Sequence, residues 1–176
     1  ANFPLLWKFS VNQVIVARPV IPEPDPDHYS CTVVVPCRNE KGNIEAAVQR
    51  TPRMGRHTEI VFVEGGSSDG TLEECYRVQE TYSERDIKVL KQDGKGKGDA
   101  VRKGFAAAEG DVLMILDADL TVIPEELPKF FRALTEGKGE FINGTRLVYQ
   151  MDQQAMRHLN LAGNKFFSWA FSYLLE

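Results

Sequence analysis

Two aspartates one residue apart, Asp117 and Asp119, follow an apolar run in the stretch DVLMILDADL at residues 111–120. Residues i and i+2 of an extended chain point to the same side, so the two carboxylates are expected to converge. Carboxylates this close repel each other unless a cation lies between them. Mg²⁺ and Mn²⁺ prefer oxygen ligands and often bind one or two carboxylates together with a substrate phosphate. The pair therefore predicts a metal site for a phosphorylated ligand, with two solvated, helix-capping aspartates as the alternative.

A second cluster, DGKGKGDAVRKG at residues 93–104, mixes glycines with Lys95, Lys97, Arg102 and Lys103. Glycines let the backbone approach a ligand closely, and the N-terminus of a helix expected to begin near Asp99 attracts anions. These features suit a diphosphate. The spacing matches neither the Walker loop nor GxGxxG. The alternative is a flexible basic surface loop.

Three further polar clusters carry candidate ligand contacts. Glu64 in VEGGSSDGT could accept a hydrogen bond from a ribose hydroxyl or a base N–H, whereas Asp69 is expected to cap the next helix. In PCRNE, Glu40 is either a pocket residue or a charge at a helix start. In NGTR, Arg146 could clamp a phosphate with two hydrogen bonds, with a plain surface arginine as the alternative.

Alternating strands and helices must position these clusters. Apolar, β-branched runs predict strands at residues 31–36, 58–64, 86–92, 111–119 and 139–148, and amphipathic stretches between them predict helices. The run before Asp117 suits a strand that is buried on both faces. This alternation predicts an α/β domain with a mostly parallel, Rossmann-like sheet and helices on both faces. Ligands of such sheets bind beyond the carboxyl ends of the strands, where the clusters lie.

Composition excludes several classes of protein. The chain has 176 residues, is 43% hydrophobic and has a net charge of −4, so it offers no overall basic field for nucleic acid. No apolar run has the roughly 18 to 20 residues of a membrane span. The three cysteines lack metal-ligand spacing, which favours a reduced, cytoplasmic protein. Because the chain starts at Ala1 and stops just after an aromatic segment, we expect a piece of a longer polypeptide.

Taken in order, the stretches VVVPCRNEKGNI, VFVEGGSSDGT, GKGDAVRKGF, DVLMILDADL and NGTR resemble the motifs of family 2 glycosyltransferases with the GT-A fold. The branch most similar to them is that of dolichol-phosphate mannosyltransferases, over residues 31 to about 175. The resemblance implies inverting transfer of a sugar from a nucleotide-diphosphate donor, GDP-mannose or a UDP-sugar, with Mg²⁺ or Mn²⁺. It implies a nucleotide-sugar-binding GT-A domain at 31–150. The prolines between Arg18 and His28 predict a lead-in segment with a Pro-rich linker at 1–30, and the dense aromatic residues near the end predict an aromatic-rich helical segment at 151–176.

The resemblance also implies roles for individual residues. The expected nucleotide pocket holds Pro36, Arg38, Glu40, Glu64 and Lys97, and the expected metal and diphosphate motif is Asp117, Ala118 and Asp119. Arg146 matches an arginine that neutralises a donor or acceptor phosphate, so Asp117, Asp119 and Arg146 are the expected catalytic residues. The family usually reads VDDGSxDGT, whereas this chain has Glu64 and Gly65, which leaves the choice of base open.

The expected acceptor is a polyprenyl or dolichyl phosphate, which is already ionised and needs little help from a general base. The aromatic segment at 151–176 either packs on the domain or forms an interfacial helix that contacts the membrane peripherally. Two other interpretations remain. The chain could be an inactive nucleotide-sugar-binding fragment. Alternatively, LDADLT could be the DxDxT motif of haloacid-dehalogenase phosphatases, although Asp152 is the only later aspartate.

Overall fold

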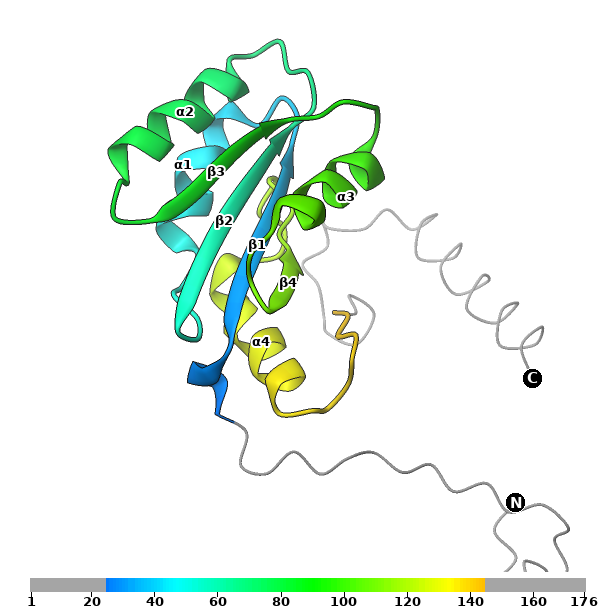
Figure 1. Ribbon diagram of the computed structural model, residues 1–176. Coiled ribbons are helices and arrows are strands. Elements are labelled where there is room, and N and C mark those ends of the chain that lie inside the picture. Colours follow the sequence, from blue (N-terminus) through cyan, green and yellow to red (C-terminus); the bar gives the residue numbers. More distant parts are fainter. Residues whose placement is uncertain (1–24, 145–176) are drawn as a thin grey trace, which may run out of the picture. The chain divides into compact units, whose positions relative to one another are not determined.

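A computed structural model describes residues 25–144 of the chain, which contain a four-stranded parallel sheet in the order β3-β2-β1-β4 (Figure 1). This arrangement confirms the predicted parallel α/β sheet. Along the chain the elements are η2 (Pro26–His28), β1 (Ser30–Cys37), α1 (Lys41–Arg50), β2 (His57–Glu64), α2 (Thr71–Thr81), β3 (Asp86–Lys91), α3 (Lys97–Ala107), β4 (Val112–Ile115), η3 (Pro124–Glu126) and α4 (Leu127–Thr135).

Strand β1 lies inside the sheet and pairs with β2 on one side and β4 on the other. Its residues from Ser30 to Val35 are all buried. A valine-rich strand of this kind suits a position covered on both faces, because β-branched side chains pack well on a pleated surface. The paired register puts the carboxyl ends of β1 and β2 level, with Cys37 opposite Glu64.

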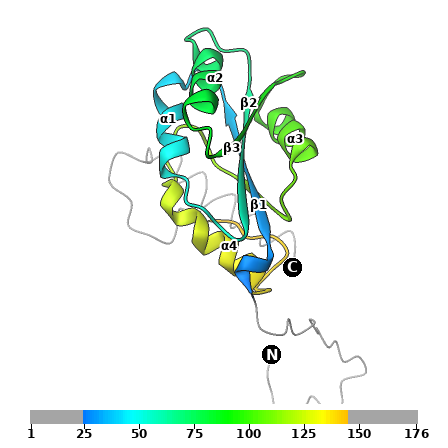
Figure 2. The ribbon, with the colours of Figure 1, turned by 60° about the vertical axis from the view of Figure 1, so that its left-hand side comes forward.

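Helices cover both faces of the sheet, as predicted (Figure 2). On one face Val33 and Val35 pack with residues of α1, α2 and α4 in the larger core cluster. On the other face Val34, Val61 and Val63 pack with Ala100 of α3. Helix α3 lies close to the strands, because a Cβ atom on Gly104 would be 2.3 Å from Val34 Cγ1.

Strand β4 differs from its prediction in length and burial. It ends at Ile115, and only alternate residues are buried, with Leu113 at 41% and Ile115 at 46% exposure. The prediction of a strand buried on both faces is therefore wrong. The reason is that β4 lies at the edge of the described sheet, while α3 packs on β1 and β2. Its inward residues, Val112 and Met114, still join the larger core.

A fifth strand was expected at residues 139–148. Residues 139–144 have no regular secondary structure, and 145–148 lie outside the described residues. Chain contacts divide the protein after Ile142, so every element named above belongs to the first unit. The predicted segment boundaries at 30/31 and 150/151 stay predictions. Within residues 25–144, no helix has the length and apolar character needed to cross a bilayer.

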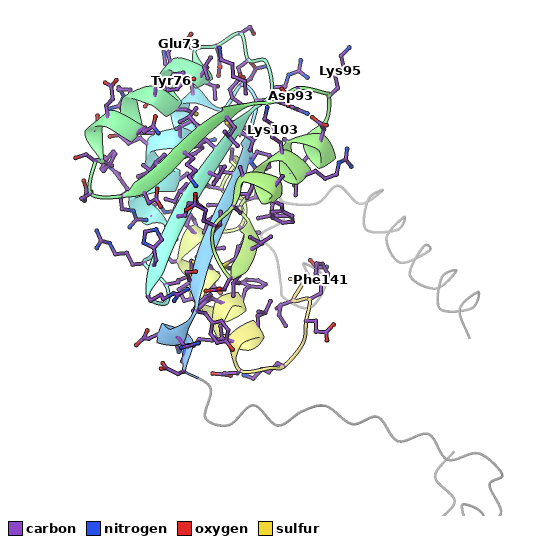
Figure 3. All side chains as sticks on the ribbon, in the orientation of Figure 1. Glu73, Tyr76, Asp93, Lys95, Lys103 and Phe141 are labelled. Carbon is purple, nitrogen blue, oxygen red and sulfur yellow. The ribbon has the colours of Figure 1, made fainter. Side chains whose placement is uncertain are left out.

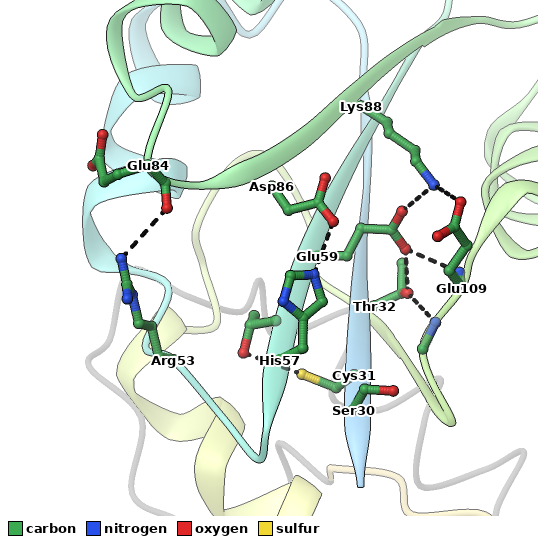
Figure 4. Close-up of polar contacts among 12 residues, drawn as sticks. Ser30, Cys31, Thr32, Arg53, His57, Glu59, Glu84, Asp86, Lys88 and Glu109 are labelled. Atoms are coloured by element: carbon green, nitrogen blue, oxygen red, sulfur yellow. Dashed lines mark hydrogen bonds and ion pairs between the residues drawn. The ribbon is translucent and has the colours of Figure 1, made fainter.

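A buried polar cluster links the segment after α3 to the amino-terminal halves of β1, β2 and β3 (Figure 4). We call Glu59, Thr32, Lys88 and Glu109 the Glu59 cluster. Glu59 is 1% exposed, and its carboxylate accepts hydrogen bonds from Thr32 Oγ1 at 2.5 Å and Glu109 N at 3.0 Å, beside Lys88 Nζ at 2.5 Å. Burial alone would raise the pKa of Glu59, but these partners outweigh it and lower the pKa. The carboxylate is therefore charged inside the fold.

Candidate functional site

A cavity of about 680 Å³ lies at the carboxyl ends of the four strands. This is the edge at which ligands bind in open parallel sheets. Every strand contributes to it through the residues that end it or follow it. The lining residues are Pro36, Cys37, Arg38 and Glu40 from β1; Val63 and Gly65 from β2; Gln92 and Gly94 to Lys97 from β3 and the loop after it; Ala100 of α3; and Asp117, Ala118 and Asp119 after β4.

The two aspartates after β4 lie in a turn rather than on an extended strand. The N–H of Leu120 donates to the carbonyl of Asp117 at 3.0 Å, and Leu120 has a φ of 52°. The two aspartates therefore do not share one side of an extended strand, as was predicted, yet both line the same cavity. A positive φ at leucine is strained, and such strain is concentrated at ligand sites. Asp119 also accepts a hydrogen bond from Thr121 N at 3.0 Å, so part of its carboxylate holds the turn.

Lys97, the first residue of α3, forms an ion pair with Asp117 across the cavity. The side chains are 59% and 33% exposed, so the pair is accessible to solvent and to ligands. Within residues 25–144, no group of three or more histidines, cysteines, aspartates or glutamates could hold a metal. Asp117 and Asp119 nevertheless fit Mg²⁺ or Mn²⁺, since these ions commonly take one or two carboxylates and complete their shell with phosphate and water.

The basic residues of the loop and of α3 divide into two groups. Lys95 and Lys97 line the cavity. Lys103 of α3 instead forms an ion pair at 2.6 Å with Asp93, which follows β3. Lys95 extends from the loop that connects β3 with α3 (Figure 3). Arg102 lies 3.9 Å from Asp99. Positive charge in the cavity therefore comes from Lys95, Lys97 and Arg38.

Hydrogen bonds brace the loops after β1 and β2 against each other. Asn39, with a φ of 56°, accepts from Ser68 N at 2.9 Å. Asp69 accepts from Lys41 N at 3.2 Å and from Thr71 N at 3.0 Å, beside its bond with the Thr71 hydroxyl. The Thr71 hydroxyl and these N–H groups lower the pKa of Asp69. Asp69 thus has a structural role, as expected, but the N-cap of α2 is Gly70, so the prediction that Asp69 caps this helix is wrong.

Glu64 is held by hydrogen bonds within the turn that follows β2. Its side chain is 5% exposed, and its carboxylate accepts from Ser67 N at 2.5 Å in the turn that follows β2. Burial would raise the pKa of Glu64, but hydrogen bonds from Ser67 and Gly66 outweigh that effect and lower it. Since Glu64 is not among the cavity's lining residues, its predicted contact with a nucleoside stays a prediction.

The other predicted residues converge. Pro36, Arg38, Glu40, Lys97, Asp117, Ala118 and Asp119 all line the cavity, and Arg146 lies outside the described residues. Glu40 precedes α1 and accepts from Asn43 Nδ2 at 2.7 Å, with no side-chain bond to the helix backbone. Sequence reasoning missed Gln92, although a polar residue at the end of a predicted strand was a usable signal.

Known proteins share this sequence and fold. The chain is 37% identical over 121 residues to a dolichol-phosphate mannosyltransferase of Saccharomyces cerevisiae, covering 65% of this chain and 44% of that protein. It is 34% identical over 110 residues to an undecaprenyl-phosphate 4-deoxy-4-formamido-L-arabinose transferase of Edwardsiella ictaluri, covering 60% and 34%. A mannosyltransferase from Pyrobaculum calidifontis, solved with GDP-Man and Mn²⁺, superposes with a TM-score of 0.54 at 28% identity, covering 64% and 35%. These similarities confirm the predicted GT-A fold.

The chain spans less than half the length of these two curated relatives. The family model described as "Glycosyl transferase family 2" matches residues 32–174, from the start of β1 to beyond the described residues. That match covers most of the chain and every motif from PCRNE to NGTR. The protein belongs to glycosyl transferase family 2.

Proposed function

We propose that the protein transfers a sugar, with inversion, from a nucleotide-diphosphate donor to a polyprenyl phosphate such as dolichyl phosphate. GDP-mannose and UDP-sugars are the candidate donors. The observation that carries the proposal is the meeting of Asp117, Asp119 and Lys97 in one cavity at the carboxyl ends of parallel strands. The names of the relatives support the sugar-phosphate chemistry and the class of acceptor.

The donor's diphosphate is expected to lie between the turn after β4 and the start of α3. Lys97 and Lys95 offer positive charge to it, and the first N–H groups of α3 add the favourable end of the helix dipole. When bound at Asp117 and Asp119, Mg²⁺ or Mn²⁺ supplies further positive charge that stabilises the departing diphosphate. Binding of the donor requires Lys97 to move from Asp117 to a phosphate oxygen.

The acceptor phosphate oxygen is ionised near neutral pH, so the reaction needs orientation of the reactants more than removal of a proton. Arg146 is the residue that we expect to neutralise the acceptor or donor phosphate. Attack from the side opposite the leaving diphosphate gives inversion at the sugar carbon. A peripheral membrane contact and a cytoplasmic location stay predictions.

Calorimetry separates this proposal from the alternative of a nucleotide-binding fragment without activity. Titrations of GDP and UDP with and without Mn²⁺ should show metal-dependent binding of at least one nucleotide. Incubation with GDP-mannose or UDP-glucose and a polyprenyl phosphate should then release the matching nucleotide diphosphate. Binding without release would favour the inactive fragment, and absence of binding to either nucleotide would refute the site. The phosphatase alternative loses its support, because the family match explains LDADLT within the ordered set of motifs.

A further inference from the structure

Gly65 and Gln92 lie side by side at the carboxyl ends of β2 and β3, and both line the cavity. The strand register ends with Glu64 opposite Lys91, and Gln92 N then donates to Glu64 O at 2.8 Å. A Cβ atom on Gly65 would lie 2.9 Å from Gln92 Oε1 and 3.5 Å from Arg38 Cβ. Gly65 does not have a positive φ, so the space that it leaves, rather than its backbone, explains the glycine. The amide of Gln92 fills that space.

The amide of Gln92 has one end fixed and one end available. Its Nε2 donates to Gly96 O at 2.7 Å, which links it to the loop before α3. Within residues 25–144, no donor is hydrogen bonded to its Oε1. Oε1 is therefore an oriented hydrogen-bond acceptor at the cavity wall. Glu64, the neighbouring acceptor, is already engaged in its own turn.

The position of Gln92 along the sheet indicates which part of a donor it would meet. Neighbouring strands are about 4.8 Å apart, so β2 and β3 lie roughly 10 to 14 Å from β4. With the diphosphate between Asp117 and Lys97, this separation is comparable with the length of a nucleoside. The base, at the far end of the nucleoside, then lies over Gly65 and Gln92.

We propose that Gln92 reads the base of the donor, with its Oε1 accepting a hydrogen bond from a ring N–H, and that Gly65 provides the room for this amide. The inference rests on the proposed function. Guanine and uracil carry a ring N–H in the middle of their pairing edge, whereas cytosine and adenine have an unprotonated ring nitrogen there. Gln92 therefore selects GDP or UDP over CDP and ADP.

Two variants and one control test this assignment, with binding measured by calorimetry in the presence of Mn²⁺. Gln92→Leu should weaken binding of the preferred nucleotide roughly 3- to 10-fold, the range expected for one lost hydrogen bond. Its affinity for inorganic pyrophosphate, which reports the β4 end of the cavity, should stay within about 2-fold of wild type, and its preference over CDP and ADP should shrink. Gly65→Ala should act in the same direction, because it displaces Oε1. Gly42→Ala, with nothing within 4 Å of the added Cβ, is the matched control.

The outcomes are distinct. Equal losses for pyrophosphate and nucleotide would overturn the assignment, because Gln92 would then act only through the loop at Gly96. An unchanged preference between bases in both variants would overturn it as well. A wild-type protein that binds pyrophosphate but no nucleotide would refute the proposed function together with this inference. If Gln92→Leu binds every nucleotide as tightly as the wild type does, the inference alone would be refuted.

Discussion

Gly104→Ala is expected to disrupt the packing of α3 on the sheet. The added Cβ would lie 2.3 Å from Val34 Cγ1, 3.0 Å from Val34 Cγ2 and 3.2 Å from Val63 Cγ2. Favourable contacts between carbon atoms are about 3.5 to 4.0 Å long. Neither valine can yield easily, because both are fully buried and β-branched side chains have restricted χ1 angles. The helix must therefore withdraw by roughly an ångström.

The expected cost follows from two opposing effects. Overpacking of a core costs about 1 to 3 kcal/mol, and three contacts at once put this site near the upper end. Replacing glycine by alanine inside a helix stabilises the helix by about 1 kcal/mol, which opposes this cost. The free energy of unfolding should therefore fall by about 2 kcal/mol. Because Lys97 begins the same helix, the variant should also bind nucleotide more weakly.

Urea unfolding followed by circular dichroism measures this change, with Gly42→Ala in α1 as the control. Gly42 has open space around it, so its replacement should leave the protein equally stable or up to about 1 kcal/mol more stable. A Gly104→Ala variant that is as stable as the control would refute the close contact between α3 and β1.

Three further predictions concern the charged groups. Lys97→Met should weaken binding of GDP or UDP. It should tighten binding of Mn²⁺ alone by up to about 5-fold, since the exposed ion pair with Asp117 is worth at most about 1 kcal/mol. Electron paramagnetic resonance of free Mn²⁺ measures this affinity, and weaker Mn²⁺ binding would contradict the role of Lys97 as a competing cation. Asp119→Ala should abolish metal-dependent nucleotide binding while lowering the free energy of unfolding by about 1 kcal/mol or less, because the exposed hydrogen bond from Thr121 N is lost. Loss of folding would instead make Asp119 structural. Glu59→Gln should destabilise the fold by about 2 kcal/mol at pH 7. The pKa of Glu59 is lowered by folding, so its contribution is fully present above the unfolded pKa of about 4.3 and is lost as the pH falls from there through the lower pKa of the folded state. Urea midpoints between about pH 6 and pH 3 should fall less steeply in the variant.

The alternation of strands and helices was predictable because its signals are local. The valine-rich β1 and the amphipathic α1 and α2 repeat the periods of their structures, and the order of the elements then implies a parallel sheet. The edge position of β4 was not predictable. An apolar run reads alike whether one face or both are covered, so only the placement of α3 over β1 and β2 decides that Leu113 and Ile115 are exposed.

The convergence of Asp117, Asp119 and Lys97 was predictable from their places after strands and before a helix. The directions of individual side chains were not. Glu64 follows β2 as expected, but free N–H groups in its own turn capture the carboxylate. Gln92 reaches the cavity because Gly65, just after the neighbouring strand β2, leaves room for its amide. Such details depend on pairs of residues that are distant in sequence.

The Glu59 cluster fixes only one end of α3, and this has a consequence for motion. Glu109 N and Gly110 N, just after the helix, donate to buried side chains, and a Cβ on Gly110 would lie 2.5 Å from Thr32 N. The other end meets the glycine loop through exposed partners. Amide hydrogen exchange in α3 should therefore be fast near Gly98 and slow toward Ala107, with opening free energies that rise along the helix. The first turn of the helix, which carries Lys97, would then open separately from the following turns, where Ala100 packs in the core and Gly104 lies against Val34.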